Sequence, residues 1–441
     1  MPYDIIVGRT PSDLQQFGKE GMIYLGKSYV KMGETTSLTN KILLDVARSH
    51  VVLVAGKRGS GKSYTLGVIA EEMASLPEEV ANNIAVLIYD TMGIFWTMAY
   101  PNEKEAELLR SWGIESKKLP VRIFVPFGFA KEYEKKGIPV TKSFALKVSE
   151  LIPDDWIATF GMNFLDPVAI LIQKIVARLN ERYSETGKDF DLDDLIMAAR
   201  EDQQTSQEIR NAAVNLFEGA RTWGLFAVKG EKGTEVKEII EGGKTSIIDL
   251  SPYSSVGTFN VRALVIGLLS KKLFNERMSE RKTEEVDAIR HGMEYLSYKE
   301  KREMPLVWIF IDEAHEFLPK EGKTPATDVL IQIIREGRQP GLSMAMATQQ
   351  PGKIHSDVMT QADIVISHRV TSKPDMEALN LIMQSYLLES ITSQMNNLPK
   401  SKGSAIILDD NSERIYPMRV KARFTWHGGE APTAIKVKER L

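Results

Sequence analysis

The sequence predicts an α/β fold built on a mostly parallel sheet, and three observations support that prediction. The apolar run 51–55 leads into a glycine-rich loop that ends in Gly61-Lys62-Ser63, the pattern of a strand, a phosphate-binding loop and a helix. Residues 306–311 form a second continuous apolar run, typical of a strand that is buried on both faces. Other short apolar runs alternate with helical patterns along the chain, as expected of parallel strands.

The composition is that of a globular protein of one large or two ordinary domains, with 441 residues, 43% hydrophobic and 26% charged. There is no cysteine, which excludes disulfides, thiolate metal sites and a cysteine nucleophile, and a reducing cytoplasm is the expected compartment. Asp4 and Arg9 interrupt the first apolar segment, so the N-terminus does not have the pattern of a secretory signal. No apolar run approaches the ~18 residues that a membrane-spanning helix needs, so a soluble protein is expected. The net charge is −3, so the surface as a whole is not basic. If the protein binds nucleic acid, its basic residues must be concentrated in one place, such as a pore or groove.

The glycine-rich loop predicts a nucleotide site. Its glycines let the backbone curl so that several N–H groups face a phosphate, and the helix that follows adds its N-terminal partial charge. We expect Lys62 to reach the outer phosphates and the Ser63 hydroxyl to hold Mg²⁺. The predicted nucleotide-binding residues are Gly56, Arg58, Gly59, Ser60, Gly61, Lys62, Ser63 and Tyr64.

Two carboxylates follow the second apolar run and predict the other half of the site. Asp312 is expected to bind Mg²⁺, directly or through water, and Glu313 to polarise the water that attacks the γ-phosphate. An ordinary strand end with acidic turn residues is the alternative. Gln349 directly follows another apolar run, 343–348, and its amide is expected to sense the γ-phosphate.

Asp90 ends a further predicted strand, 84–89, at the position where open α/β sheets bind ligands. A cap of the following turn or helix is an equally good interpretation of this residue.

The chain divides into five predicted segments. Asp166-Pro167 and Asp191 are helix-start signals within the third of them, where the pattern becomes mostly helical. The segments are a short β-element (1–45), the first part of the α/β core (46–141), a helical insertion (142–240), the second part of the core (241–430) and a C-terminal tail (431–441).

The run Asp312-Glu313-Ala314-His315 invites comparison with superfamily 2 helicases, but its position argues against them. About 250 residues separate Lys62 from Asp312, which is more than a compact RecA-like half needs. The residues after Asp312 also leave no room for a second full RecA-like domain.

Several motifs together resemble the HerA/FtsK clade of P-loop ATPases, and HerA more closely. The resemblance covers roughly residues 45–430 and implies a RecA-like P-loop NTPase core. Four stretches carry the resemblance. The first runs from 312–319 through Arg335 and Gly341 to 348–351, and the second is Ser49-His50, just before the strand of the phosphate loop. The third is 248–251, and the fourth is a C-terminal stretch that contains 403–406, Pro417, Arg423 and His427-Gly428-Gly429.

The resemblance implies an ATP-hydrolysing hexameric ring that drives double-stranded DNA through its pore and works with the nuclease NurA on DNA ends. It also implies an arginine supplied to the ATP of a neighbouring subunit, for which Arg335, Arg338 and Arg369 are candidates. For each of these arginines, a salt bridge or a helix cap is an equally good interpretation. Pore-facing DNA contacts are expected from lysines that could also be ordinary surface residues, namely Lys229, Lys232, Lys320 and Lys323.

Two departures from the HerA pattern leave the nuclease partner open. Only about 50 residues precede the phosphate loop, so the N-terminal β-barrel of HerA proteins is expected to be absent or truncated. The family pattern Asp-Pro-His-Gly-Glu-Tyr is replaced by residues 90–95, which keep the aspartate and the glycine. The alternatives are a HerA-like motor of a defence or DNA-packaging system, and a nucleotide-switched scaffold that moves no DNA. A scaffold would not need Glu313.

Overall fold

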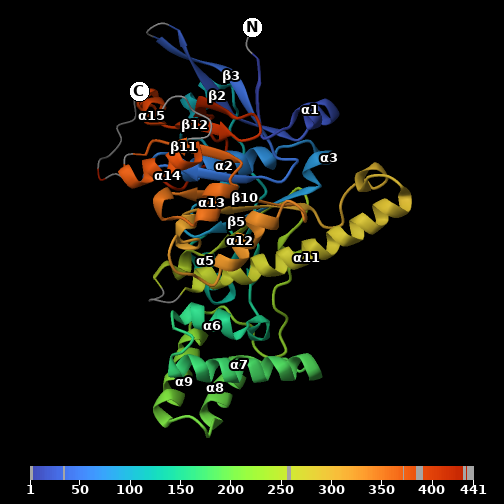
Figure 1. Cartoon of the computed structure of the whole chain (residues 1–441), viewed down its shortest axis with the longest axis vertical. Helices are drawn as coiled ribbons and strands as arrows, with labels where there is room; N and C mark the ends of the chain where they lie inside the picture. Colours follow the sequence, from blue (N-terminus) through green and yellow to red (C-terminus); the bar gives the residue numbers. More distant parts are fainter. Residues whose placement is uncertain are drawn as a thin grey trace.

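The computed structural model describes residues 3–32, 35–255, 260–370, 372–383, 391–430 and 434. These residues form one sheet of 13 strands in the order β1-β3-β2-β13-β12-β11-β4-β10-β9-β5-β8-β6-β7 (Figure 1). The strands are β1 (Ile5–Val7), β2 (Met22–Met32), β3 (Thr35–Asp45), β4 (Val51–Ala55), β5 (Ile84–Asp90), β6 (Arg122–Pro126), β7 (Lys142–Phe144), β8 (Thr245–Asp249), β9 (Leu306–Ile311), β10 (Leu342–Thr348), β11 (Ile364–His368), β12 (Ser404–Asp409) and β13 (Arg414–Val420).

From β11 to β7 every neighbouring pair of strands in this order is parallel, which confirms the predicted α/β fold. Alternate residues of each central strand face opposite sides, and both sides are buried. On β4, Val52 and Val54 pack with Leu66 of α2, whereas Leu53 belongs to the apolar cluster that contains Leu264 of α11. The sheet is therefore covered by helices on both faces.

One face carries α2 (Lys62–Met73), α4 (Ala106–Trp112) and α5 (Ala130–Lys135), and the other carries α11 (Val261–His291), α12 (Thr327–Glu336) and α13 (Ser356–Gln361). Shorter helices lie in the connections, at α1 (Pro11–Phe17), α3 (Glu78–Ala81) and α10 (Val236–Ile239). Near the C-terminus lie α14 (Lys373–Met383) and α15 (Ile391–Asn397). No described helix is long and apolar enough to span a membrane.

The predicted N-terminal strands extend the same sheet. β2 and β3 form an antiparallel hairpin, and β2 continues the sheet by pairing with β13. A buried ion pair between Arg9 and Asp45, with 2.8 Å between guanidinium nitrogen and carboxylate oxygen, ties the segment after β1 to the end of β3.

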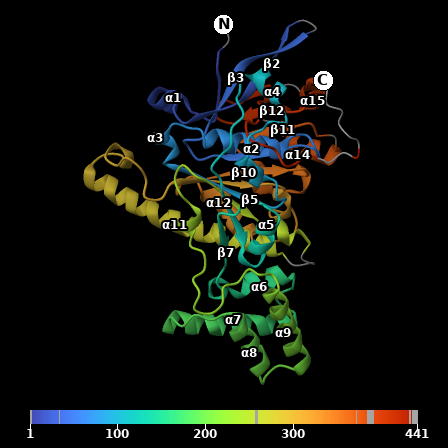
Figure 2. The same cartoon turned by 180° about the vertical axis from the view of Figure 1, so that it is seen from behind.

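Four helices lie at the opposite end of the molecule from this hairpin (Figures 1 and 2). They are α6 (Pro153–Phe160), α7 (Pro167–Thr186), α8 (Leu192–Glu201) and α9 (Gln207–Arg221). Trp156 is fully buried among them and contacts Phe160 and Phe217. Asp191 caps α8 by accepting hydrogen bonds from the Asp193 and Asp194 amides, as the sequence predicts.

Three details differ from the sequence predictions. Residues 142–144 belong to the predicted helical insertion, but they form β7 and pair with β6. The chain thus adds one more strand to the sheet before the helices α6 to α9 begin. Asp166 precedes α7, but its carboxylate accepts from the Asn163 amide at 2.8 Å and does not cap the helix. Thr324-Pro325 is a further helix-start signal in the sequence, but the helix that follows it, α12, begins at Thr327. The predicted tail 431–441 lies outside the described residues, apart from residue 434.

Candidate nucleotide site

The sheet order brings the two halves of the predicted site to one edge. β10 lies between β4 and β9 and is parallel to both, so the carboxyl ends of these strands are neighbours. The phosphate loop follows β4, Gln349 follows β10, and Asp312 and Glu313 follow β9. Residues about 250 positions apart in the chain therefore meet at the position where parallel sheets bind ligands.

The loop has the backbone that a phosphate cradle requires. Gly59 and Gly61 have φ angles of 73° and 111°, in the region that favours glycine. The tip of the loop is exposed, and Arg58 lies on it. Within the described residues, the Ser60 hydroxyl is buried without a hydrogen-bond partner. An unpaired buried hydroxyl in this loop fits a bound phosphate.

Lys62 begins α2 and lies beneath the loop, 5% exposed. Its Nζ donates a hydrogen bond to the Lys57 carbonyl at 3.3 Å. Burial lowers the pKa of Lys62, while the carboxylates of Glu313 and Asp312 oppose that shift. The ammonium group is thus held near the acidic pair with donors left for a ligand.

Ser63 and Asp312 make the contact expected of a divalent cation site. The Ser63 hydroxyl donates to Asp312 Oδ2 at 2.5 Å. Burial raises the pKa of Asp312, which is 3% exposed. A hydroxyl and a carboxylate beside a phosphate cradle are oxygen ligands that suit Mg²⁺, so these residues fit the metal that the motif implies.

Glu313 has an unusual backbone and an unusual partner. Its φ of 51° and ψ of 44° are left-handed, a conformation that non-glycine residues rarely adopt. The Gln349 amide donates to Glu313 Oε1. The other carboxylate oxygen, Oε2, is buried with no hydrogen-bond partner among the described residues. One oxygen is therefore oriented by Gln349 and the other remains available as an acceptor.

His315 was not among the predicted site residues, yet it lies against Glu313. Its Nδ1 is 3.6 Å from Glu313 Oε2 and 3.2 Å from the Thr348 hydroxyl at the end of β10. His368, at the end of β11, contacts Thr65 in the first turn of α2 at 2.8 Å. The sequence motifs include His315 but give it no role, and no motif includes His368, because the partners Thr348 and Thr65 come from other elements of the fold.

Tyr64 directs its side chain away from the phosphate loop. Its hydroxyl donates to Glu105 at 3.1 Å and accepts from the Arg423 amide at 2.7 Å. Only the backbone of Tyr64, in the first turn of α2, remains as a phosphate contact.

The three candidate arginines lie at two different edges of the sheet. Arg369 follows β11 beside the phosphate loop, but its guanidinium donates to the Leu398 carbonyl at 2.7 Å. Arg335 and Arg338 lie where α12 returns to the amino end of β10, the edge opposite the loop. Arg335 pairs with Asp357 at 2.6 Å, whereas Arg338 is exposed and has no ion pair or hydrogen bond to a described residue.

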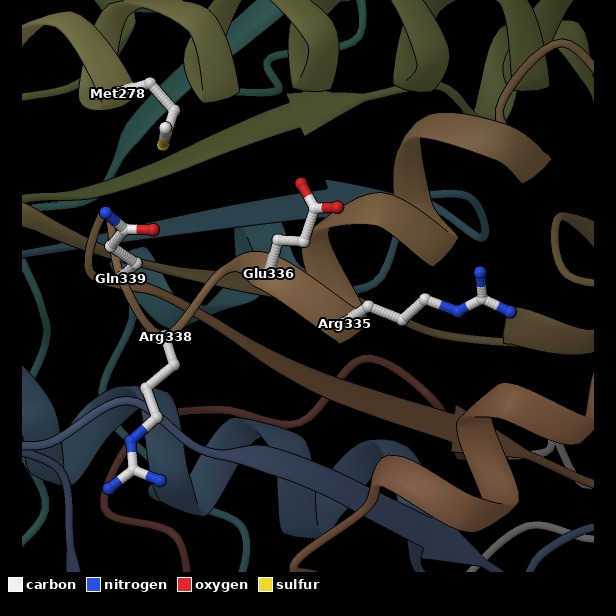
Figure 3. A pocket seen from close by; sticks show the side chains of 5 residues that line it. All are labelled: Met278, Arg335, Glu336, Arg338 and Gln339. Atoms are coloured by element: carbon white, nitrogen blue, oxygen red, sulfur yellow. The ribbon is translucent and has the colours of Figure 1, made fainter.

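Arg335 and Arg338 line a surface pocket of about 480 Å³, together with Met278, Glu336 and Gln339. Figure 3 shows the two guanidinium groups pointing in different directions from the end of α12. The pocket therefore lies away from this subunit's own phosphate loop.

Asp90 acts as a cap of the turn that follows β5. Its carboxylate accepts from the Phe95 amide at 2.7 Å and the Met92 amide at 3.3 Å. Asp90 is paired in register with Asp249 on β8, and both are buried. Burial, and then the neighbouring Asp249, raise the pKa of Asp90 to about 7.

The predicted DNA-contacting lysines differ in their pairing. Lys229 binds Asp194 at 2.8 Å and Lys323 binds Asp328 at 2.8 Å, so both charges are partly neutralised within the chain. Lys232 and Lys320 are exposed.

The family model described as "Helicase HerA, central domain" matches residues 28–272. This chain belongs to the HerA family. It is 23% identical over 442 residues to the DNA double-strand break repair helicase HerA of Pyrococcus furiosus, covering 93% of this chain and 74% of that relative. A probable HerA of Methanocaldococcus jannaschii is 26% identical over 154 residues, which is 32% of this chain and 29% of that protein. The HerA resemblance found in the motifs is confirmed, and the chain is a nucleotide-binding P-loop ATPase.

Solved structures agree on the fold of this HerA-family chain. VirB4 of Thermoanaerobacter pseudethanolicus matches with a TM-score of 0.55 and 12% identity over 91% of this chain and 96% of that one. The conjugative coupling protein TrwB matches with a TM-score of 0.51 and 12% identity over 86% and 87% of the two chains. At this identity the likeness establishes the RecA-like P-loop fold alone.

Proposed function

We propose that this chain uses ATP and Mg²⁺ to drive double-stranded DNA through the pore of a homo-hexameric ring. Family membership and the arrangement at the carboxyl edge of the sheet support this proposal. The observation that carries it is Glu313, which lies near Lys62. The Gln349 amide holds one of its carboxylate oxygens, and the other is buried 3.6 Å from His315 Nδ1 without a hydrogen-bond partner among the described residues.

In this proposal the phosphate loop binds the nucleotide through residues 56–64, and Lys62 neutralises charge on the outer phosphates. Ser63 and Asp312, already in contact at 2.5 Å, hold the metal. When bound, Mg²⁺ would neutralise the negative charge that develops on the phosphates during hydrolysis. Burial of Lys62 and Asp312 makes these electrostatic contacts stronger than they would be in water.

Glu313 is the proposed general base, and it accepts the proton of the water that attacks the terminal phosphorus. The unpaired Oε2 is the acceptor for that proton, while the Gln349 amide fixes Oε1. A left-handed backbone at Glu313 costs roughly 1–3 kcal/mol, and such strain concentrates at functional sites. This favours a working base over an ordinary acidic turn and argues against a nucleotide-switched scaffold.

Arg338 is the arginine that we propose to act on the ATP of a neighbouring subunit. Its position at the edge opposite its own phosphate loop suits a contact across a subunit interface. Arg335 and Arg369 are weaker candidates, because an ion pair and a carbonyl contact already engage their guanidinium groups.

DNA contacts and partners follow from the same proposal. Lys320 and Lys232 are better candidates for phosphate contacts than Lys323 and Lys229, whose charges are paired within the chain. A nuclease that processes DNA ends is the proposed partner, because the Pyrococcus relative is named a double-strand break repair helicase. We also propose that residues 46–141 and 241–430 form the motor core, flanked by residues 1–45 and interrupted by the helical insertion at 142–240.

The direct test compares steady-state ATP hydrolysis with and without linear duplex DNA at low salt. Duplex DNA is expected to stimulate the wild-type chain several-fold and single-stranded DNA to stimulate it less. The matched control is Glu313→Gln, which retains the shape of the side chain and should bind ATP while its turnover falls by roughly 10²-fold or more. Unchanged wild-type hydrolysis with duplex DNA would contradict the motor proposal, and retained turnover in Glu313→Gln would contradict the assignment of the base.

A further inference from the structure

His368 lies directly beneath the phosphate loop, although no contact with nucleotide is expected of it. It is the last residue of β11 and is fully buried. A Cβ atom built on Gly56 would stand 2.7 Å from His368 Cβ, so the loop rests on the histidine with no space between them. A Cβ atom on Gly61 would stand 3.6 Å from His368 Cε1.

The two ring nitrogens of His368 join separate elements. Nδ1 is 3.1 Å from the Ser404 carbonyl of β12, and Nε2 is 2.8 Å from the Thr65 hydroxyl in the first turn of α2. A carbonyl oxygen can only accept, so Nδ1 carries the proton and Nε2 is an acceptor. The Thr65 hydroxyl must therefore donate to reach His368.

The Thr65 hydroxyl has a single proton, which His368 Nε2 and the Gly61 carbonyl of the phosphate loop share as acceptors, because that carbonyl oxygen lies 3.0 Å from the hydroxyl oxygen. The Thr65 amide also donates to that carbonyl, at 2.8 Å. Thr65 thus joins the histidine below to the loop residue that immediately precedes Lys62. The orientation of the first turn of α2 depends on this junction, and Lys62 and Ser63 lie in that turn.

Burial keeps the imidazole neutral by lowering the pKa of His368 to about 4, and the Lys62 charge acts in the same direction. A neutral ring keeps Nε2 an acceptor at physiological pH. It also avoids a second positive charge beneath Lys62.

We propose that His368 is a positioning residue for the phosphate loop, and that it acts through Thr65 to orient Lys62 and Ser63 toward a bound nucleotide. The inference rests on the proposed function only in that ATP binds this loop. Its contact with Ser404 also connects the loop to β12, and through β13 to the N-terminal hairpin.

The test measures the dissociation constant of a fluorescent ATP analogue with Mg²⁺, together with kcat and KM for ATP. Thr65→Val keeps the shape of the side chain but removes the hydroxyl, and it should weaken binding by about 3- to 10-fold, the size of one neutral hydrogen bond. Thr65→Ser restores the hydroxyl and should bind within about 2-fold of the wild type. The loss in Thr65→Val should appear mainly as a higher KM for ATP, with little change in kcat.

Two substitutions at His368 separate its contacts. In His368→Asn the amide can replace Nδ1 at Ser404 but is too short to reach Thr65, whereas the longer side chain of His368→Gln can reach Thr65. We expect binding to be weaker in His368→Asn than in His368→Gln. Adding Thr65→Val to His368→Asn should weaken binding by less than the sum of the two single effects, since both remove the contact between His368 and Thr65. His291→Asn, which removes an exposed histidine stacked on Tyr298, is the control and should bind as the wild type does.

Equal dissociation constants for Thr65→Val and the wild type would overturn the inference, as would additive effects in the double variant. Neither result would affect the proposed function, because the dissociation constants that decide the inference are measured without DNA and without hydrolysis. A wild-type chain that binds no nucleotide would instead overturn the proposed function itself.

Discussion

At the scale of single residues, the site depends on side chains that are buried with unfinished hydrogen bonding. Ser60 Oγ and Glu313 Oε2 have no partner among the described residues, although burial without a partner costs about 1–3 kcal/mol for each group. Both residues belong to the motifs that predict a nucleotide site. We infer that this cost is recovered when the nucleotide and its attacking water are bound.

Asp90 supplies a test by pH at the same scale. Its pKa in the folded chain is raised to about 7, above that of an ordinary aspartate. The folded state therefore holds a proton that the unfolded chain releases, and this contribution to stability is lost as the pH rises from about 4 to about 7. Asp90→Asn should gain stability relative to the wild type, on the order of 2 kcal/mol, between pH 5 and pH 8.

Urea unfolding of both proteins at the two pH values measures this difference, and the titrating groups that do not interact with Asp90 cancel in the comparison. Asp249 is the exception, because its charge acts on Asp90. A difference between the variant and the wild type that does not change with pH would show that Asp90 is ionised in the folded chain.

The sequence identified the site residues that belong to motifs and missed those that depend on the fold. Lys62, Ser63, Asp312 and Glu313 are recognisable because phosphate and metal chemistry requires those residue types at fixed positions after a strand. His368 is recognised only when β11 is known to lie beside β4.

At the scale of elements, α2 is fixed to the C-terminal segment by a buried acidic side chain. Glu71 accepts hydrogen bonds from the amides of Phe424 and Thr425, at 3.0 and 3.2 Å. Burial raises the pKa of Glu71, and the charge of Arg423 opposes that shift. The Arg423 guanidinium covers Gly67, where a Cβ atom would stand 2.3 Å from it. The segment after β13 therefore fixes the helix that carries Lys62.

The type of an element, helix or strand, was predictable where its own apolar residues show a clear period. The length of an element was not predictable from that pattern. The apolar pattern predicts a helix around 261–274, and the dense charge of 276–304 predicts a solvated helix or excursion; α11 has 31 residues and continues to His291. The buried Arg277 supports this extension, because it binds Glu284 two turns further along the helix and also the carbonyls of Met304 and Pro340. Most charged residues after Phe274 are exposed or half-buried, as predicted, whereas the burial of Arg277 and Glu284 depends on contacts that the sequence does not show.

At the scale of the whole molecule, the nucleotide site and the Arg338 pocket occupy opposite edges of the sheet. A ring in which each subunit offers one edge to the next would bring these features together. Helices α6 to α9 and the N-terminal hairpin lie at opposite ends of the molecule (Figures 1 and 2).

Arg338→Ala tests this arrangement. If Arg338 serves a neighbour's ATP, turnover should fall by roughly 10³-fold while nucleotide affinity changes little. Mixing Arg338→Ala with Glu313→Gln subunits should restore some hydrolysis, because sites that combine an intact Glu313 with an intact neighbouring Arg338 then form. The absence of any recovery in mixed rings, or a strictly monomeric wild type, would exclude action between subunits.

The central claim is that hydrolysis moves the chain along duplex DNA, and displacement of a third strand from a linear duplex tests it most directly. With ATP and Mg²⁺ the wild type should release the third strand, whereas Glu313→Gln, or the wild type with a non-hydrolysable analogue, should not. Hydrolysis that is stimulated by duplex DNA but releases no third strand would contradict translocation.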